Sequence, residues 1–315
     1  MDKLRYELTL HGGDYEHTLS LTGRWGKLAL EYQTDPVVDI FRRMISDRSY
    51  DACEMSLSNY MMLRARGEQW LCALPIFPYR AFRHSAVYVA ANSNLNDPRQ
   101  LEGLRLGVPD YAMTAAVWVR GILYEHYGVD WRSIEWFTSG SRMPLPPSIE
   151  VRAATGDLLD ELISGRLDAL ILPSGPKQSL GVNEIPPVRR LFPDVTQVER
   201  EYFLSTGIHP IMHTVVVKTD KLDTVPELSE MLFKAYSSSK QVAFSRRLSR
   251  STLPWGRVAW DEIDQLFQGD PLPYGLTSNN IRTLKKLGDY LLAQRLIQRP
   301  VDLASMFALG SEGLV

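Results

Sequence analysis

Short apolar or alternating segments recur along the chain, separated by segments with helical spacing. Residues 6–11 alternate polar and apolar side chains, which is typical of a half-buried strand. Residues 36–46 place Val38, Phe41 and Ile45 at helical spacing, and a short strand is expected at 50–56. The order strand, helix, strand predicts an α/β protein with a largely parallel sheet.

The middle of the chain starts this alternation afresh. Strands are expected at 104–109 and 134–138, with a helix at 113–127 between them. A glycine-closed helix at 156–165 is followed by an apolar strand at 167–172. Between the strand at 134–138 and this helix, residues 139–149 form a loop rich in Gly, Pro and Ser. After residue 172, helices are expected at 225–236, 240–248 and 278–294.

Two apolar strands predict where the chain passes between two lobes. They lie at about 86–91 and 213–218, and we expect them to run side by side. The sequence thus predicts a discontinuous lobe 1 from residues 1–86 and 216–315, and a lobe 2 from residues 87–215. Proteins of this plan bind their ligand in the cleft between the lobes.

Composition excludes several classes of function. The formal net charge of −2 gives no bulk attraction to nucleic acid or to an acidic membrane surface. No stretch has the length of a transmembrane helix, and the first residues do not resemble a secretory signal. Cys53 and Cys72 match no zinc spacing and are expected to be free thiols, which favours a reducing cytoplasm.

A cluster of basic residues precedes the first crossing strand. Arg80 and Arg83 lie three residues apart on a loop, and a planar guanidinium can pair bidentately with a carboxylate. Thr114, at the start of the 113–127 helix, can add a hydroxyl and free backbone amides. Together these residues predict a site for a small anion, although surface ion pairs and a plain helix cap would give the same pattern.

Several longer motifs resemble one family. They are Ser20-Leu-Thr-Gly-Arg24, Tyr50-Asp-Ala-Cys-Glu-Met-Ser-Leu-Ser58, Pro78-Tyr-Arg-Ala-Phe-Arg-His-Ser85, the run from Gly107 to Gly121, Ile211-Met-His-Thr-Val-Val216 and Pro273-Tyr-Gly275. In this order they resemble the 4,5-dihydroxyphthalate decarboxylase family. That resemblance implies a type 2 periplasmic-binding-protein-like fold without an export signal, with each lobe a sheet flanked by helices.

The resemblance also implies a reaction. A hydroxylated aromatic dicarboxylate would lose carbon dioxide without oxidation, after protonation of the ring carbon para to a hydroxyl. The chemistry then requires groups that hold carboxylates, one proton donor and a partner for the phenol. It requires no organic cofactor, and the expected partner is a small aromatic carboxylate; a homo-oligomer is left open.

Histidines supply the candidate proton donors. His84 and His213 each stand at the end of a predicted crossing strand, and histidine titrates near neutral pH. Glu54 can orient a histidine or accept a phenolic proton, and open α/β sheets place ligand groups at such strand ends. The remaining candidates for substrate binding are Ser56, His11, Tyr111 and Tyr274.

Other interpretations stay open at this level. Each histidine can be a satisfied core residue, Glu54 can cap a helix, and Tyr274 can simply pack. Three histidines with Glu54 could hold a divalent metal, although no compact spacing signature is present. An intracellular binding protein for a small anion, or a dehydratase or lyase acting on a related carboxylate, would share the arginine anchors.

Overall fold

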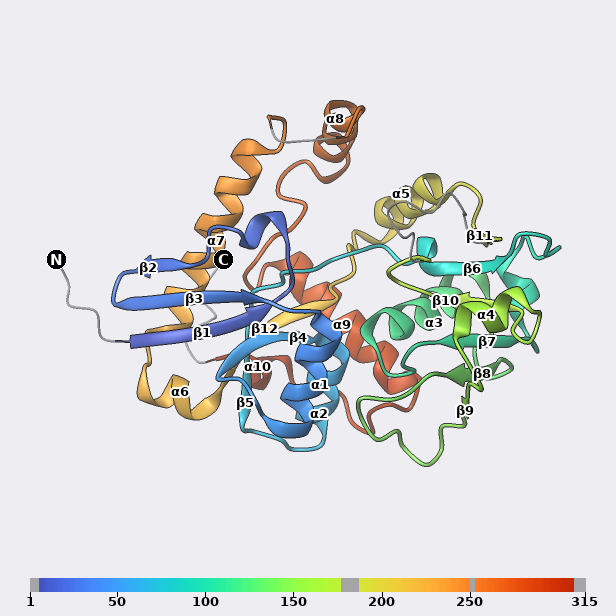
Figure 1. The fold of residues 1–315 in the computed structure, drawn as a ribbon, viewed down its shortest axis with the longest axis horizontal. Coiled ribbons are helices and arrows are strands. Elements are labelled where there is room, and N and C mark those ends of the chain that lie inside the picture. Colours follow the sequence, from blue (N-terminus) through green and yellow to red (C-terminus); the bar gives the residue numbers. More distant parts are fainter. Residues whose placement is uncertain (1–5, 177–186, 250–252, 309–315) are drawn as a thin grey trace. The chain divides into compact units, whose positions relative to one another are not determined.

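The computed structural model describes residues 6–176, 187–249 and 253–308. The chain divides into two compact units. Unit 1 contains the described residues up to Arg80, the segment Ile211–Lys285 and the residues from Pro300 on. Unit 2 contains Ala81–Pro210 and Lys286–Arg299. Each unit has its own mixed sheet with helices against it, which confirms the predicted α/β organisation (Figure 1).

The sheet of unit 1 has six strands. Its central strand β4 is parallel to β1 and antiparallel to β12, and β1 is also parallel to β3. The strand order is β2 (Gly23–Trp25), β3 (Leu28–Thr34), β1 (Tyr6–Gly12), β4 (Ala52–Ser56), β12 (His213–Lys218) and β5 (Leu71–Leu74). The helical segments are η1 (Glu16–Thr18), α1 (Val37–Asp47), α2 (Leu57–Ala65), α6 (Thr219–Thr224), α7 (Leu228–Arg246), α8 (Gly256–Phe267) and α10 (Leu303–Met306).

The sheet of unit 2 also has six strands. Strands β10, β7, β8 and β9 are parallel to one another, and β6 runs antiparallel to β10 and β11. The strand order is β11 (Val188–Arg190), β6 (Val87–Ala90), β10 (Ala169–Ile171), β7 (Arg105–Val108), β8 (Glu135–Thr138) and β9 (Arg152–Ala153). The helical segments are η2 (His84–Ala86), η3 (Pro98–Leu101), α3 (Thr114–Tyr127), α4 (Leu158–Ile163) and α5 (Val195–Thr206).

The two expected crossing strands do not pair with each other, and this prediction was wrong. Strand β6 lies in the sheet of unit 2, whereas β12 lies between β4 and β5 in unit 1. Both strands are buried and apolar on both faces, so side-chain alternation could not assign either one to a sheet. Within unit 1, the connecting segments meet instead at an isolated bridge between Arg80 and Ile211.

Helix α9 (Ser278–Ala293) begins in unit 1 and ends in unit 2. All of residues 216–315 were expected in lobe 1, whereas residues 286–299 group with unit 2. The reason is packing against α3: the ring of Tyr290 meets Trp118 edge-on at 5.4 Å. A Cβ at Gly121 would lie 2.2 Å from the Tyr290 ring, so only glycine allows this approach.

Helix α7 is one continuous element where two helices were expected. The three serines at 237–239, which lie between the two expected helices, include neither glycine nor proline to end a helix. Ser239 is buried, and its hydroxyl accepts a hydrogen bond from the amide of Ser20 at 3.2 Å. A tertiary partner therefore satisfies a polar residue inside the helix.

Candidate active site

The carboxylate of Glu54 is the centre of a buried polar cluster in unit 1. Glu54 lies on β4 and is fully buried. Its Oε2 accepts a hydrogen bond from the amide of Gly13 at 2.8 Å, and its Oε1 accepts one from the hydroxyl of Tyr15 at 2.7 Å. His213 Nδ1 lies 2.5 Å from the same Oε1. Three groups from distant parts of the sequence thus converge on one carboxylate.

These contacts determine the charge of Glu54. Burial alone would raise the pKa of its carboxyl group, but the hydrogen bond and the charge of His213, together with the bonds from Gly13 and Tyr15, lower the pKa. Burial and the nearby Glu54 charge also raise the pKa of Tyr15, which keeps its hydroxyl protonated as a donor. An ionised Glu54 accepts from Nδ1–H of His213, which leaves Nε2 as the ring nitrogen that can meet a ligand.

Aromatic rings fix the orientation of His213. Its ring meets Phe41 edge-on at 4.9 Å and lies 5.1 Å from the ring of Tyr79. Tyr79 in turn stacks on Tyr15 at 5.7 Å, with an interplanar angle of 7°. The Tyr15 hydroxyl therefore reaches Glu54 from a ring that is itself held in place.

Two adjacent glycines make room for this arrangement. A Cβ at Gly12 would lie 2.2 Å from the hydroxyl oxygen of Tyr32, and a Cβ at Gly13 would lie 2.4 Å from Cζ of Tyr15. The Tyr32 hydroxyl donates to the carbonyl of Gly13 at 2.7 Å. The close neighbours of these two glycines are therefore the two tyrosine rings.

Ser56 is the last residue of β4, opposite His213 in the strand ladder. It precedes α2 as the residue that caps this helix, but its side chain makes no capping hydrogen bond. Its hydroxyl lies 3.4 Å from that of Ser58. The role of Ser56 in substrate binding stays a prediction.

Arg80 is buried and holds the 273–280 segment of unit 1. Its Nη2 donates to the carbonyl of Pro273 at 2.9 Å and to the side-chain oxygen of Asn280. Tyr274, in the same segment, is also buried, and the Lys240 ammonium lies 4.0 Å from the centre of its ring. The Tyr274 hydroxyl has no hydrogen-bond partner among the described residues. Both residues keep their predicted substrate roles as predictions.

His11 has a different environment from His213. Its Nδ1 lies 2.9 Å from the carboxylate of Asp35, and its ring packs against Tyr50 at 4.2 Å. Together with Glu7 and Thr9 it lines a hollow of about 520 Å³ in unit 1. The predicted role of His11 in substrate binding stays a prediction.

His84 belongs to unit 2 and lies in an aromatic environment. The rings of Phe192 and Tyr202 meet it at 5.3 and 5.4 Å, and neither ring nitrogen has a hydrogen-bond partner among the described residues. Burial, assisted by His126, lowers the pKa of His84 to about 4. Its neighbour Arg83 is also buried; burial raises the pKa of the nearby Glu199, and the bonds from Ser85 and the charge of Arg83 offset this only in part. Their predicted roles stay predictions.

Tyr111 and Thr114 lie at the start of α3 in unit 2, and both are buried. The Arg120 guanidinium stacks 3.8 Å above the ring of Tyr111 and donates to its carbonyl at 2.8 Å. Tyr111 also lines a hollow of about 470 Å³, together with Trp136 and Gln294. The Tyr111 ring is thus fixed from one side by a fully buried arginine.

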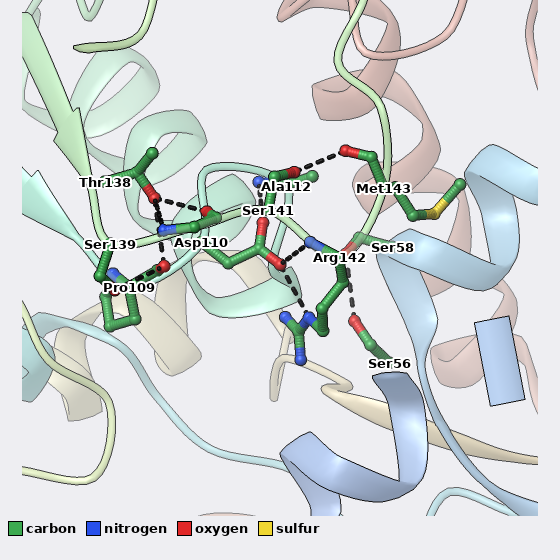
Figure 2. A network of polar contacts seen from close by, with 11 residues as sticks. Ser56, Ser58, Pro109, Asp110, Ala112, Thr138, Ser139, Ser141, Arg142 and Met143 are labelled. Carbon is green, nitrogen blue, oxygen red and sulfur yellow. Dashed lines mark hydrogen bonds and ion pairs between the residues drawn. The ribbon is translucent and has the colours of Figure 1, made fainter. Parts of the chain in front are cut away.

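An ion pair that the sequence analysis did not identify joins two loops of unit 2 (Figure 2). Arg142 Nε donates to the carboxylate of Asp110 at 2.7 Å, and both side chains are about nine-tenths buried. Asp110 also accepts from the amide of Ala112 at 2.9 Å, while the hydroxyls of Thr138 and Ser139 each donate to Pro109 at 3.1 Å. The loops after the parallel strands β7 and β8 are therefore bound together. The only sequence signal was their shared position at strand ends.

No group of three or more His, Cys, Asp or Glu side chains in the described ranges is arranged to hold a metal ion. Among the helices that the structure describes, none is long and apolar enough to cross a membrane. The predictions on cofactors, oligomeric state and compartment stay predictions.

The comparisons with solved structures show the fold. The aliphatic sulphonate binding protein SsuA of Escherichia coli has a TM-score of 0.61 at 13% identity, covering 98% of this chain and 99% of that protein. A Candida albicans protein with the generic periplasmic-binding-protein fold has a TM-score of 0.56 at 14% identity, covering 97% and 95%. The desulfurization enzyme DszB has a TM-score of 0.55 at 17% identity, covering 96% and 97%. The predicted periplasmic-binding-protein-like fold is confirmed.

The comparisons of sequence show the family. No protein-family model matches the chain. A 4,5-dihydroxyphthalate decarboxylase of Comamonas testosteroni is 37% identical over 256 residues, which cover 76% of this chain and 77% of that protein. One of the same name from Pseudomonas putida is 36% identical over 149 residues, covering 44% of this chain and 58% of that protein. The chain therefore belongs to the 4,5-dihydroxyphthalate decarboxylase family, whose members are carboxy-lyases.

Proposed function

We propose that this protein decarboxylates 4,5-dihydroxyphthalate, or a close hydroxylated aromatic dicarboxylate, with His213 as the proton donor. The names of the two relatives support this choice of substrate. The observation that carries the assignment of the donor is the 2.5 Å contact between His213 Nδ1 and Glu54. A buried, ionised carboxylate stabilises the protonated imidazole and orients its other nitrogen, Nε2, toward a reacting group.

The proposed reaction is balanced without an oxidant or a reductant. The proton of Nε2 adds to the ring carbon that bears the departing carboxylate, and the hydroxyl para to it supplies electron density as the dienone forms. The carbon–carbon bond then breaks, its electron pair restores the aromatic ring, and carbon dioxide leaves. One carboxylate and both hydroxyls remain, so the product is 3,4-dihydroxybenzoate.

Glu54 also takes part in this scheme, and we assign it as a positioning residue for His213. It touches His213 and Tyr15 and is fully buried. As the imidazole gains and loses its proton, the buried charge on Glu54 compensates the change. The amide of Gly13 keeps the carboxylate in one rotamer through Oε2.

The test is turnover of 4,5-dihydroxyphthalate in heavy water. We expect release of carbon dioxide and formation of 3,4-dihydroxybenzoate with one deuterium at the vacated ring carbon. His213→Asn should lower kcat by about 10²- to 10⁴-fold, the usual contribution of a general acid. His126→Asn, at an exposed histidine of unit 2, is the control and should keep full activity.

Two results would count against this proposal. Full activity of His213→Asn would remove the assigned proton donor while leaving the reaction in place. Absence of turnover for every hydroxylated phthalate or benzoate tested would remove the reaction itself, and recovery of tightly bound, unchanged ligand would then favour a binding protein.

A further inference from the structure

His17 is a buried histidine beside the Glu54 cluster to which the sequence analysis assigned no role. It lies in the short helix η1 of unit 1 and is only 8% exposed. Its ring bonds to the backbone of Pro78, which has no N–H and can only accept. His17 Nε2 is closed off from solvent and has no hydrogen-bond partner among the described residues. The bond to Pro78 therefore uses Nδ1–H, and Nε2 presents a lone pair.

A buried acceptor without a donor is unfavourable, by roughly 1–3 kcal/mol. Native proteins satisfy most such atoms, and an exception calls for an explanation such as a bound water or a ligand. A lone pair on a neutral imidazole needs a hydroxyl or an N–H as its partner. The unsatisfied atom therefore selects for a ligand that can donate a hydrogen bond.

The position of His17 connects it to the proposed proton donor. Its ring stacks on Tyr15 at 5.3 Å, with an interplanar angle of 4°. The other neighbour stacked on Tyr15 is Tyr79, whose ring lies 5.1 Å from that of His213. The hydroxyl of Tyr15 reaches Glu54 at 2.7 Å. His17 thus belongs to the same column of rings that holds the Glu54–His213 pair.

The surroundings of His17 keep its ring neutral. Burial lowers the pKa of His17, and the bond to Pro78 and the charges of Glu54 and Asp270 offset this only in part, while Lys240 lowers the pKa further. A neutral ring accepts through Nε2, whereas a protonated ring would donate from both nitrogens. The two histidines are therefore suited to opposite tasks. His213 contacts a carboxylate, which favours a protonated ring that donates, whereas His17 contacts a carbonyl and keeps a neutral ring that accepts.

We propose that His17 is a further substrate-binding residue, with Nε2 accepting a hydrogen bond from the phenolic hydroxyl para to the departing carboxylate. This inference rests on the proposed function. As the ring carbon gains its proton, the para oxygen develops carbonyl character and its proton becomes more acidic. The hydrogen bond to Nε2 therefore strengthens towards the transition state, which is the condition for it to accelerate the reaction. When carbon dioxide leaves, the hydroxyl recovers its original bond, so no net proton is lost.

The experiment compares two ligands on three proteins by calorimetry. The ligands are 3,4-dihydroxybenzoate and benzoate, which differ only in the hydroxyls. The proteins are the wild type, His17→Phe and His17→Gln. Phenylalanine keeps a flat ring to stack on Tyr15 but has no acceptor, whereas glutamine keeps an acceptor oxygen. Should His17→Phe not fold, His17→Leu replaces it in the comparison with His17→Gln.

We expect wild-type protein to bind the dihydroxy ligand more tightly than benzoate. His17→Phe should reduce this preference by about tenfold, the effect of losing one hydrogen bond, while benzoate affinity stays unchanged. His17→Gln should retain part of the preference. In turnover, His17→Phe should lower kcat by more than it raises KM, because the bond strengthens in the transition state.

If folded His17→Phe keeps the wild-type preference for 3,4-dihydroxybenzoate over benzoate, the inference is overturned. His17 Nε2 would then be assigned to a structural water as its hydrogen-bond partner. The same holds if the wild type does not distinguish the two ligands. These outcomes are separate from a failure of the proposed function, since calorimetry requires no turnover. If the wild type binds the dihydroxy ligand more tightly because of His17 but releases no carbon dioxide, only the proposed reaction is contradicted.

Discussion

His213 lies diagonally opposite Glu54 on the antiparallel ladder between β4 and β12. The backbone of His213 pairs with Ser56, and that of Val215 pairs with Glu54. Side chains alternate between the two faces of a strand, so Glu54 and His213 project from the same face. Diagonal neighbours on one face are within reach of long side chains. A shift of one residue would turn His213 to the opposite face, so the strand register itself sets this contact.

Replacement of Glu54 by Gln should separate its charge from its shape. The amide would fill the same space, but it brings an N–H₂ group into a site where Gly13, Tyr15 and His213 all donate. We expect kcat to fall by about 10²-fold or more, because an imidazolium would lose its buried counter-charge. Rates of product formation, compared with the midpoint of thermal unfolding, measure this effect. Wild-type kcat in a folded Glu54→Gln protein would show that the carboxylate has no part in the reaction.

Gly13→Ala should damage the site through Tyr15. The new Cβ would lie 2.4 Å from Cζ of that ring, so the ring has to move away and its bond to Glu54 is lost. We expect activity to fall by at least about tenfold, which corresponds to one hydrogen bond. Gly269→Ala is the matched control, since a Cβ there meets nothing within 4 Å. Equal activities of the two variants would contradict the importance of the Tyr15 contact.

Local patterning predicts much of this fold but not all of the site. Strand β1 follows from alternation, β7 and β12 from short apolar runs, and the helix α3 from helical spacing, all of which depend only on near neighbours. Glu54 and His213 could be named because each stands near the end of an apolar strand, where α/β folds place polar ligand groups. Their contact could not be predicted, because it depends on the register of β12 against β4.

Tyr15 and His17 escaped prediction for a different reason. They lie at a short 3-10 turn whose sequence has no periodicity: Tyr15 stacks on Tyr79, far away in the chain, and His17 stacks on Tyr15. The same limit applies to Arg142, whose partner Asp110 lies 32 residues earlier in the sequence. Tertiary pairing of loops leaves almost no trace in local composition.

His84 should make the stability of the protein depend on pH. Its pKa is lowered from 6.5 to about 4, mainly by burial. Between these two pH values the histidine is protonated in the unfolded chain but neutral in the folded protein. The neutral ring stabilises the fold fully above pH 6.5, and this contribution is lost as the pH falls towards 4. The loss amounts to about 3 kcal/mol over that range. Chemical denaturation at a series of pH values measures it.

The matched variant for this test is His84→Phe, which keeps an aromatic ring among Phe192 and Tyr202 but has no titrating group. Its unfolding free energy should fall less between pH 6.5 and pH 4 than that of the wild type. Other groups still titrate, among them His126, whose pKa burial also lowers. If the wild type and the variant lose stability in parallel, His84 does not carry the effect.

The pair formed by Asp110 and Arg142 should contribute more to stability than the exposed pairs of unit 2. Its side chains are 9% and 11% exposed, and both the amide and Nε of Arg142 donate to the carboxylate. Arg142→Gln leaves the charge of Asp110 without its partner in a buried place, so we expect unfolding to become easier by about 3 kcal/mol. Arg132→Gln removes a comparable bond to Asp130 on the surface, with an expected cost below about 1 kcal/mol.

The double variant Asp110→Asn/Arg142→Gln should recover part of the loss, because no buried charge is then left alone. Equal denaturation midpoints for Arg142→Gln and Arg132→Gln would mean that the two loops are held together by their neutral hydrogen bonds instead.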